Sequence, residues 1–228
     1  QGYIKKISLI SLRSSGEQKL KEDDFILQEA ETHNKAELLL FSDKGVVYKL
    51  RIHELADSKA SMLGDYLNNI LNLEAEEKII KMFATDHYEG HFLFAYENGK
   101  MAKIPLSSYA TKTNRKKLAN AYSLESPLID IFFLGEDRDF AARSSIDKVL
   151  VFNTSQINPK TTRSSQGVSV LKSKKGSFLT KLLPAEEARL SDLDYYRANI
   201  PAIGCYLKEE DKEDRQIGLT DIDGKASE

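Results

Sequence analysis

The sequence predicts an all-β repeat fold with a propeller-like arrangement of about four blades. The main observation is a pattern of two β-rich runs joined by a tight turn with glycine, which recurs at intervals of 43 and 54 residues. A pattern that recurs at such intervals is typical of a repeat architecture. Each repeat also offers about four short apolar runs, and four-stranded units around an axis are the blades of a propeller.

Three copies of the pattern are nearly complete, and their turn glycines are Gly2, Gly45 and Gly99. Counted from each glycine, positions +2, +5 and +10 are apolar and position +4 is lysine. The lysines at +4 are Lys6, Lys49 and Lys103, and the residues at +10 are Leu12, Leu55 and Tyr109. Such runs, separated by a few residues that include glycine, predict hairpins. We expect a polar, mostly basic loop after each hairpin.

A fourth copy is degenerate. Asp147 stands at the turn, and Val151 replaces the lysine at +4. Aspartate accepts the left-handed conformation more readily than most residues, so a turn is still expected. The first copy lacks a strand before Gly2. The chain thus starts directly on a strand pattern, and we expect it to be a domain excised from a longer protein.

Two further segments need separate treatment. Residues 61–73 have apolar residues at near-helical spacing, but the repeat context favours a loop followed by a strand. Residues 184–193 begin with proline and acids, which predicts a short C-terminal helix. In two copies, a second glycine follows the hairpin. We assign Gly64 to the second copy and Gly167 to the fourth. We expect residues 1–207 to form the repeat domain and residues 208–228 to be a charged linker or a disordered tail.

The net charge of −2 hides an uneven distribution. Residues 185–228 carry a net charge of −6, and the remaining residues carry +4. Two windows contain no acid at all: residues 100–124 hold six bases and residues 148–184 hold seven. A basic stripe matters more than total charge for a polyanionic ligand. The alternative for each cluster is an ordinary solvated surface.

Several classes of chemistry have no signature in this chain. Phosphate-binding glycine loops and a serine at nucleophile-elbow spacing are absent. Cys205 is the only cysteine, lies in an apolar stretch and is expected to be inert. His87 and His91 are four residues apart, but the sequence between them resembles a turn, so surface histidines are favoured over a metal site. We expect no cofactor, no metal and no membrane-spanning segment, and we expect a cytoplasmic, nucleoid-associated protein.

The motifs resemble the C-terminal domain of bacterial type IIA topoisomerase A subunits, the A subunits of DNA gyrase and topoisomerase IV. Gly-Tyr-Ile-Lys-Lys at residues 2–6 is similar to the opening motif of that domain, and residues 40–50 and 98–109 are similar to later repeats. Residues 52–57, followed by Leu63-Gly64, are similar to the topoisomerase IV version. The resemblance covers roughly residues 1–183.

The resemblance implies a β-pinwheel, a propeller-like disc whose blades exchange strands and whose basic rim bends duplex DNA. It also implies an ATPase B subunit, together with the rest of the A subunit, as partners, with the DNA-cleaving tyrosine in another domain. The bases that we expect to contact phosphates are Lys5, Lys6, Arg13, Lys49, Arg51, Lys100, Lys103, Lys112, Arg115, Lys116, Lys117, Lys160, Arg163, Lys172, Lys174 and Lys175. For the lysines at +4, the alternative is that their stems pack over the strand while their ammonium groups reach water.

One departure from the family bears on the type of enzyme. Gyrase carries a Gln-Arg-Arg-Gly-Gly-Lys-Gly box in the first repeat, whereas residues 12–20 of this chain read Leu-Arg-Ser-Ser-Gly-Glu-Gln-Lys-Leu. This difference favours topoisomerase IV or a divergent relative. A propeller used for protein–protein contacts is the alternative function, and the acidic C-terminal residues support it. An enzyme would need a convergent polar pocket that the sequence does not indicate.

Overall fold

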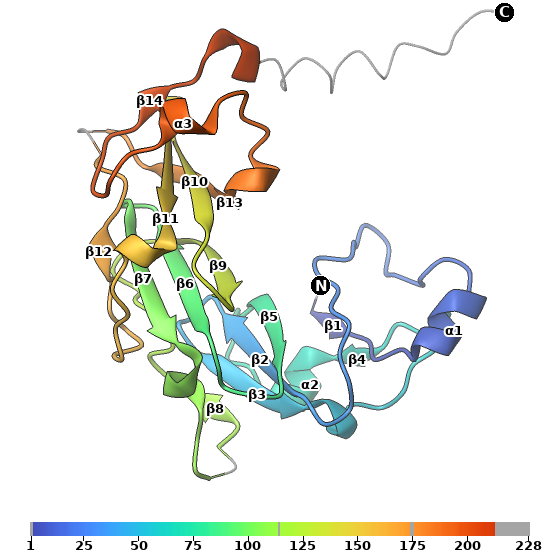
Figure 1. Cartoon of the computed structure of the whole chain (residues 1–228). Helices are drawn as coiled ribbons and strands as arrows, with labels where there is room; N and C mark the ends of the chain where they lie inside the picture. Colours follow the sequence, from blue (N-terminus) through green and yellow to red (C-terminus); the bar gives the residue numbers. More distant parts are fainter. Residues whose placement is uncertain (1, 114, 174–175, 213–228) are drawn as a thin grey trace, which may run out of the picture. The chain divides into compact units, whose positions relative to one another are not determined.

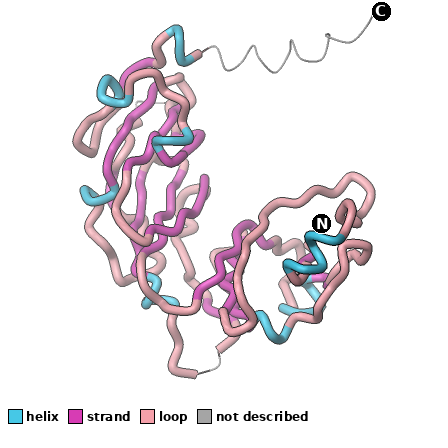
Figure 2. The backbone as a smooth tube through the Cα atoms, turned by 45° about the vertical axis from the view of Figure 1, so that its right-hand side comes forward, coloured by secondary structure: helices cyan, strands magenta, loops and turns pink. Residues whose placement is uncertain are grey.

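The computed structural model describes residues 2–113, 115–173 and 176–212, and these form two compact units. Unit 1 comprises Gln1–Glu89 and Leu106–Leu124, and unit 2 comprises Gly90–Pro105 and Glu125–Glu228. Strands and loops make up most of both units, and the helices are short (Figures 1 and 2). The described strands form four antiparallel sheets, which confirms the prediction of an all-β fold of about four blades.

Unit 1 holds the first and second sheets. The first sheet has only two short strands, β1 (Tyr3–Ile4) and β4 (Asp65–Tyr66). The second sheet has the order β5-β2-β3-β8. Its strands are β2 (Glu37–Ser42), β3 (Val47–Arg51), β5 (Ile79–Thr85) and β8 (Lys117–Leu118).

Unit 2 holds the third and fourth sheets, with the orders β12-β7-β6-β9 and β13-β10-β11-β14. The strands of the third sheet are β6 (His91–Tyr96), β7 (Lys100–Pro105), β9 (Leu128–Leu134) and β12 (Val168–Ser169). Those of the fourth sheet are β10 (Asp139–Ser144), β11 (Lys148–Asn153), β13 (Leu179–Pro184) and β14 (Cys205–Tyr206).

The repeat seen in the sequence is reproduced in the backbone. Gly45, Gly99 and Asp147 have φ angles of 69°, 78° and 54°, so the degenerate fourth turn is left-handed as predicted. In the second, third and fourth sheets, the register shifts at the same place, three residues before the turn residue. These shared irregularities show that the three hairpins are built on one plan.

The last strand of each sheet comes from a later part of the chain than its hairpin. In the third sheet, β12 pairs with β7 so that Val168 lies opposite Met101. Gly167, just before β12, approaches the carbonyl of Met101 so closely that a Cβ atom would overlap it. The second glycine therefore serves the preceding hairpin rather than the one we assigned: Gly64 approaches Ile4, and Gly167 approaches Met101.

Gly204 holds the same place in the fourth sheet, where a Cβ atom would lie 2.6 Å from the carbonyl oxygen of Val149. Gly204 lies outside the glycine pattern from which the repeats were predicted. Strand exchange explains both errors, because a strand that pairs with an earlier hairpin leaves no local pattern in the sequence.

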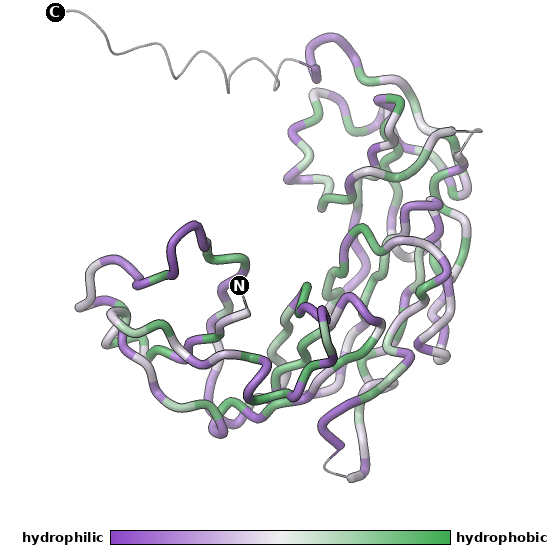
Figure 3. The backbone as a smooth tube through the Cα atoms, turned by 180° about the vertical axis from the view of Figure 1, so that it is seen from behind, coloured by the Kyte–Doolittle hydropathy of each residue, from purple (hydrophilic) through white to green (hydrophobic). Residues whose placement is uncertain are grey.

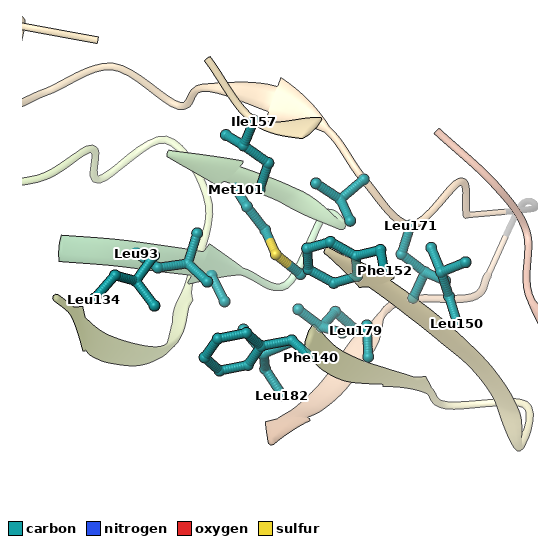
Figure 4. Close-up of a cluster of buried hydrophobic side chains, with 13 residues drawn as sticks. Leu93, Met101, Leu134, Phe140, Leu150, Phe152, Ile157, Leu171, Leu179 and Leu182 are labelled. Carbon is teal, nitrogen blue, oxygen red and sulfur yellow. The ribbon is translucent and has the colours of Figure 1, made fainter. Parts of the chain in front are cut away.

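The cores follow the predicted apolar positions. Hydrophobic residues gather along the strands (Figure 3). In unit 2, Leu93 and Met101 of the third sheet pack in one cluster with Phe140, Phe152 and Leu182 of the fourth (Figure 4). At position +10, Leu55, Tyr109 and Ile157 are buried, whereas Leu12 is exposed on α1 (Leu9–Ser14).

The two segments that needed separate treatment, residues 61–73 and 184–193, contain only short elements of secondary structure. The stretch expected as a loop and a strand contains β4 followed at once by a single helical turn, α2 (Leu67–Leu71). The expected C-terminal helix is divided into a 3₁₀ turn (Ala185–Glu187) and α3 (Leu193–Tyr196). Arg189 between them has a φ of 48°, which interrupts a helix, and the Asp192 side chain caps the new one. The remaining 3₁₀ turns are Ile52–Glu54, Leu106–Tyr109, Thr154–Gln156 and Glu209–Asp211.

Candidate nucleic-acid interface

The exchanged strands lie at the edges of their sheets, and two of the three segments that contain them carry predicted bases. We call residues 111–118 the second edge, residues 158–172 the third edge and residues 191–212 the fourth edge. Each is named after the sheet to which its strand (β8, β12 or β14) is added. The second edge belongs to unit 1, and the other two belong to unit 2.

Each of the three lysines at position +4 is paired with a carboxylate. The Nζ atom of Lys6 lies 2.9 Å from Asp57, that of Lys49 lies 3.1 Å from Glu37, and that of Lys103 lies 2.5 Å from Asp137. Only 5% of the Lys49 side chain and 6% of the Lys103 side chain are exposed. Both ammonium groups therefore lie within the protein. This position differs from the predicted phosphate contact and also from the alternative, in which the ammonium groups reach water.

Lys49 is surrounded on all sides. Its Nζ lies 4.9 Å from the centre of the Tyr88 ring and donates a hydrogen bond to Thr111 at 3.2 Å. The Tyr88 hydroxyl in turn donates to Glu37, and burial together with this carboxylate raises the pKa of Tyr88. Tyr88 thus keeps its proton, and Glu37 holds both the lysine and the tyrosine.

Lys103 occupies the matching place in the third sheet. Besides Asp137, its ammonium group reaches the carbonyl oxygen of Thr154 at 3.4 Å. Burial raises the pKa of Asp137, but the hydrogen bonds from Lys103 and Thr154 outweigh it, so the pKa lies below its ordinary value. Burial and the charge of Lys103 both lower the pKa of His91, which keeps this histidine neutral near pH 7.

The fourth copy has a substitute for the missing lysine. Arg197 forms a bridge with Val151 and places its guanidinium 2.8 Å from Asp139. The hydrogen bond from Arg197 lowers the pKa of Asp139. A cation–carboxylate pair is therefore retained although the cation comes from the exchanged segment, and for that reason the repeat pattern could not reveal it.

The predicted bases of unit 1 outside the second edge are dispersed. Lys5 is half-buried and donates to the carbonyl oxygens of Lys19, at 2.6 Å, and Ala60, at 3.3 Å, and burial lowers its pKa. Arg13 lies exposed in the last turn of α1, and Arg51 lies exposed at the end of β3. These three bases lie on different segments of the chain, and no contact among the described residues joins them into one basic surface.

The second edge brings four predicted bases together. Lys112 and Arg115 are exposed. Lys116 forms an ion pair with Glu54 at 2.7 Å, and Lys117 forms one with Glu74 at 3.0 Å. The hydrogen bond to Glu74 raises the pKa of Lys117, so this amine stays charged.

The third edge brings together Lys160, Arg163 and Lys172. Lys160 and Lys172 are exposed, Arg163 is half-buried, and the exposed Lys100 on β7 lies opposite Ser169 of β12. The backbone of this edge is firmly attached, because the Lys160 N–H donates to the Lys103 carbonyl at 2.8 Å and the Lys172 N–H donates to Ala202 at 2.7 Å. Lys174 and Lys175 lie outside the described residues.

Within residues 2–113, 115–173 and 176–212, no group of three or more His, Cys, Asp or Glu side chains is placed to hold a metal ion. Cys205 is half-buried on β14, with its sulfur 3.5 Å from the Tyr195 carbonyl. In the same described part of the chain, no helix combines the length and the apolar character needed to span a membrane.

The fold is similar to that of a known class of propeller domain. A family model described as "DNA gyrase C-terminal domain, beta-propeller" matches residues 36–86 and 144–186. The C-terminal domain of ParC from E. coli has a TM-score of 0.70 at 13% identity and covers 91% of this chain and 91% of its own. At this identity, the second similarity shows the fold alone.

Two topoisomerase IV proteins are more similar in sequence. The A subunit of DNA topoisomerase 4 from Staphylococcus aureus is 27% identical over 184 residues, which are 78% of this chain and 23% of that protein. A crystal structure of the C-terminal domain of DNA topoisomerase IV has a TM-score of 0.69 at 28% identity and covers 80% of this chain and 58% of its own. The resemblance to the C-terminal domain of type IIA topoisomerase A subunits, and the β-pinwheel fold, are therefore confirmed. This chain spans about a quarter of the length of the curated relative.

Proposed function

We propose that this chain is a non-catalytic module that binds and bends duplex DNA for a type IIA topoisomerase, using the exposed bases of the second and third edges. The observation that carries the proposal is the sequence of these two edges, which are added to equivalent hairpin strands and which both contain several bases and no acid. Lysine and arginine would neutralise phosphates and release counterions, so affinity would come mainly from charge.

The similarity to topoisomerase A subunits supports a DNA-binding role in general. We further propose that an ATPase B subunit, together with the remainder of an A subunit, is a partner, and that the DNA-cleaving tyrosine lies outside this chain. No cofactor is needed for phosphate binding, and a cytoplasmic location at the nucleoid fits this role.

Contacts to phosphates position a protein without reading bases, so sequence preference is expected to be weak and to follow DNA bendability. Bending a site of 20–30 bp costs on the order of 1–6 kcal/mol. Several phosphate contacts must offset this cost, which favours edges that each carry several bases over dispersed lysines.

Titration of a labelled 25-bp duplex by fluorescence anisotropy, between 50 and 200 mM salt, tests the proposal. Two paired variants, Lys112→Gln with Arg115→Gln and Lys160→Gln with Lys172→Gln, are each expected to lower the log–log salt slope by about 1.8, because each phosphate contact contributes about 0.9. Lys35→Gln with Lys59→Gln removes the same charge from exposed positions outside both edges and should leave the slope unchanged. Absence of binding at 50 mM salt would reject the proposal.

The ion pairs of the second edge lead to a further prediction. Glu74→Gln is expected to tighten DNA binding about two- to threefold, because Lys117 loses the carboxylate that now holds it at 3.0 Å. Stability should change by less than about 1 kcal/mol, as for other exposed pairs. Glu76→Gln, which removes the same charge two residues away on the exposed surface, is the control for a general electrostatic effect.

One observation favours the alternative, a protein–protein interaction module. Unit 1 has a cavity of about 1780 Å³ beside the two-stranded first sheet, and the side chains around it include Phe25, which is 72% exposed. Ile10 on α1 is 82% exposed. Exposed apolar residues beside a hollow are a feature of many protein interfaces. The DNA titration separates the two functions, because only the DNA-binding module would show the steep salt dependence.

A further inference from the structure

The two edges of unit 2 occupy equivalent places but carry opposite charge. β12 pairs with β7 at Met101, and β14 pairs with β11 at Val149, which are both +2 residues. The third edge contains bases and no acid. The acids of the fourth edge are Asp192, Asp194, Glu209, Glu210 and Asp211, against the three bases Arg197, Lys208 and Lys212.

The bases of the fourth edge are already occupied by carboxylates. Arg197 lies 2.8 Å from Asp139 and 3.3 Å from Asp194. Lys208 lies 3.0 Å from Asp192, and Lys212 lies 2.5 Å from Glu209. A phosphate would have to displace these carboxylates before it could use any of the three cations.

The acids are also fixed in place. Tyr196 is buried, its hydroxyl donates to Asp211, and this hydroxyl accepts the Lys208 N–H at 2.9 Å. Ser191 donates through its N–H to Asp211 and through its hydroxyl to Glu210, both at 2.7 Å. The negative side chains at the centre of this edge therefore cannot simply turn away from an approaching polyanion.

We infer that the fourth edge excludes duplex DNA, so that the DNA path on unit 2 is confined to the third edge. The inference rests on the proposed DNA-binding function and adds the boundary of the binding surface. Like charges raise the energy of a wrong contact, and an acidic border next to a basic edge therefore restricts where a duplex can lie.

Reversing two exposed acids of the fourth edge tests the boundary. Asp194→Lys with Glu209→Lys should steepen the log–log salt slope for the 25-bp duplex by about 1.8, because two new phosphate contacts become available. It should also lengthen the shortest duplex that binds with full affinity. The control is Glu136→Lys with Glu187→Lys, which makes the same charge change at exposed positions of unit 2 outside both edges. Its slope should equal that of the wild type.

The outcomes separate this inference from the proposed function. If the wild type binds DNA and the fourth-edge variant keeps the wild-type slope and duplex length, the inference is overturned. It is also overturned if the control variant steepens the slope equally. If the wild type itself fails to bind DNA at 50 mM salt, the proposed function is rejected and the inference falls with it. Asp194→Asn with Glu209→Gln, which preserves side-chain size, should raise affinity severalfold and serves if the lysine variant does not fold.

Discussion

Gly167→Ala is expected to lower the free energy of unfolding by about 3 kcal/mol or more, an effect at the upper end for a single substitution. Gly167 has a φ of 74°, and a Cβ atom there would overlap the carbonyl oxygen of Met101. The carbonyl carbon of Met101 at 2.5 Å and the Cα of Ala102 at 2.6 Å would also be too close, so the clash is with backbone that cannot move aside. Relief would require β12 to separate from β7. Urea unfolding followed by circular dichroism measures the loss.

Gly176 provides the matched control for this substitution. Its φ of 83° is as unfavourable for alanine as that of Gly167, but nothing lies within 4 Å of the position that a Cβ would take. Gly176→Ala should therefore cost only about 1–2 kcal/mol, the strain of a left-handed alanine. Equal losses for the two variants would mean that close strand approach contributes nothing at Gly167.

Local patterns explain why much of the fold could be predicted. The hairpins, their left-handed turns and the buried +10 residues depend on residues close together in the chain, and Gly45 and Asp147 behave as expected. Strand exchange is a relation between distant segments. The partner of Gly167 is Met101, sixty-six residues earlier in the sequence, and no periodicity near Gly167 indicates this choice.

The candidate site shows the same division. The absence of acids from the second and third edges is visible in the sequence alone. The burial of the +4 lysines is not visible in the sequence, because their carboxylate partners lie at different distances along the chain. Glu37 precedes Lys49, whereas Asp137 follows Lys103. A lysine on a strand is usually exposed, so the pattern suggested a phosphate contact where the structure has an internal ion pair.

Lys103→Met is expected to lower the free energy of unfolding by about 2 kcal/mol at pH 7. Removing one partner of a fully buried pair costs about 3–5 kcal/mol, and the smaller value allows for water at Asp137, which is 39% exposed. The pKa of Asp137 in the wild type lies below its ordinary value, so the stability from this pair is complete above about pH 4 and is lost as the pH falls through the lower value. In the variant, Asp137 keeps the hydrogen bond from Thr154 but loses the one from Lys103, so its pKa is expected to be higher than in the wild type. The difference between wild type and variant should therefore be largest near pH 7 and narrow below pH 4 in urea unfolding.

Lys160→Gln gives the opposite result if the assignment of roles is correct. Lys160 is exposed on the third edge, so its replacement should change stability by less than about 0.5 kcal/mol while lowering the salt slope of DNA binding by about 0.9. Lys103→Met, assayed at a temperature where it is folded, should keep the wild-type slope, because the ammonium group of Lys103 in the wild type faces Asp137 rather than solvent. A Lys103→Met variant with undiminished stability and a lower salt slope would instead return Lys103 to the phosphate-contacting set that the repeat pattern suggested.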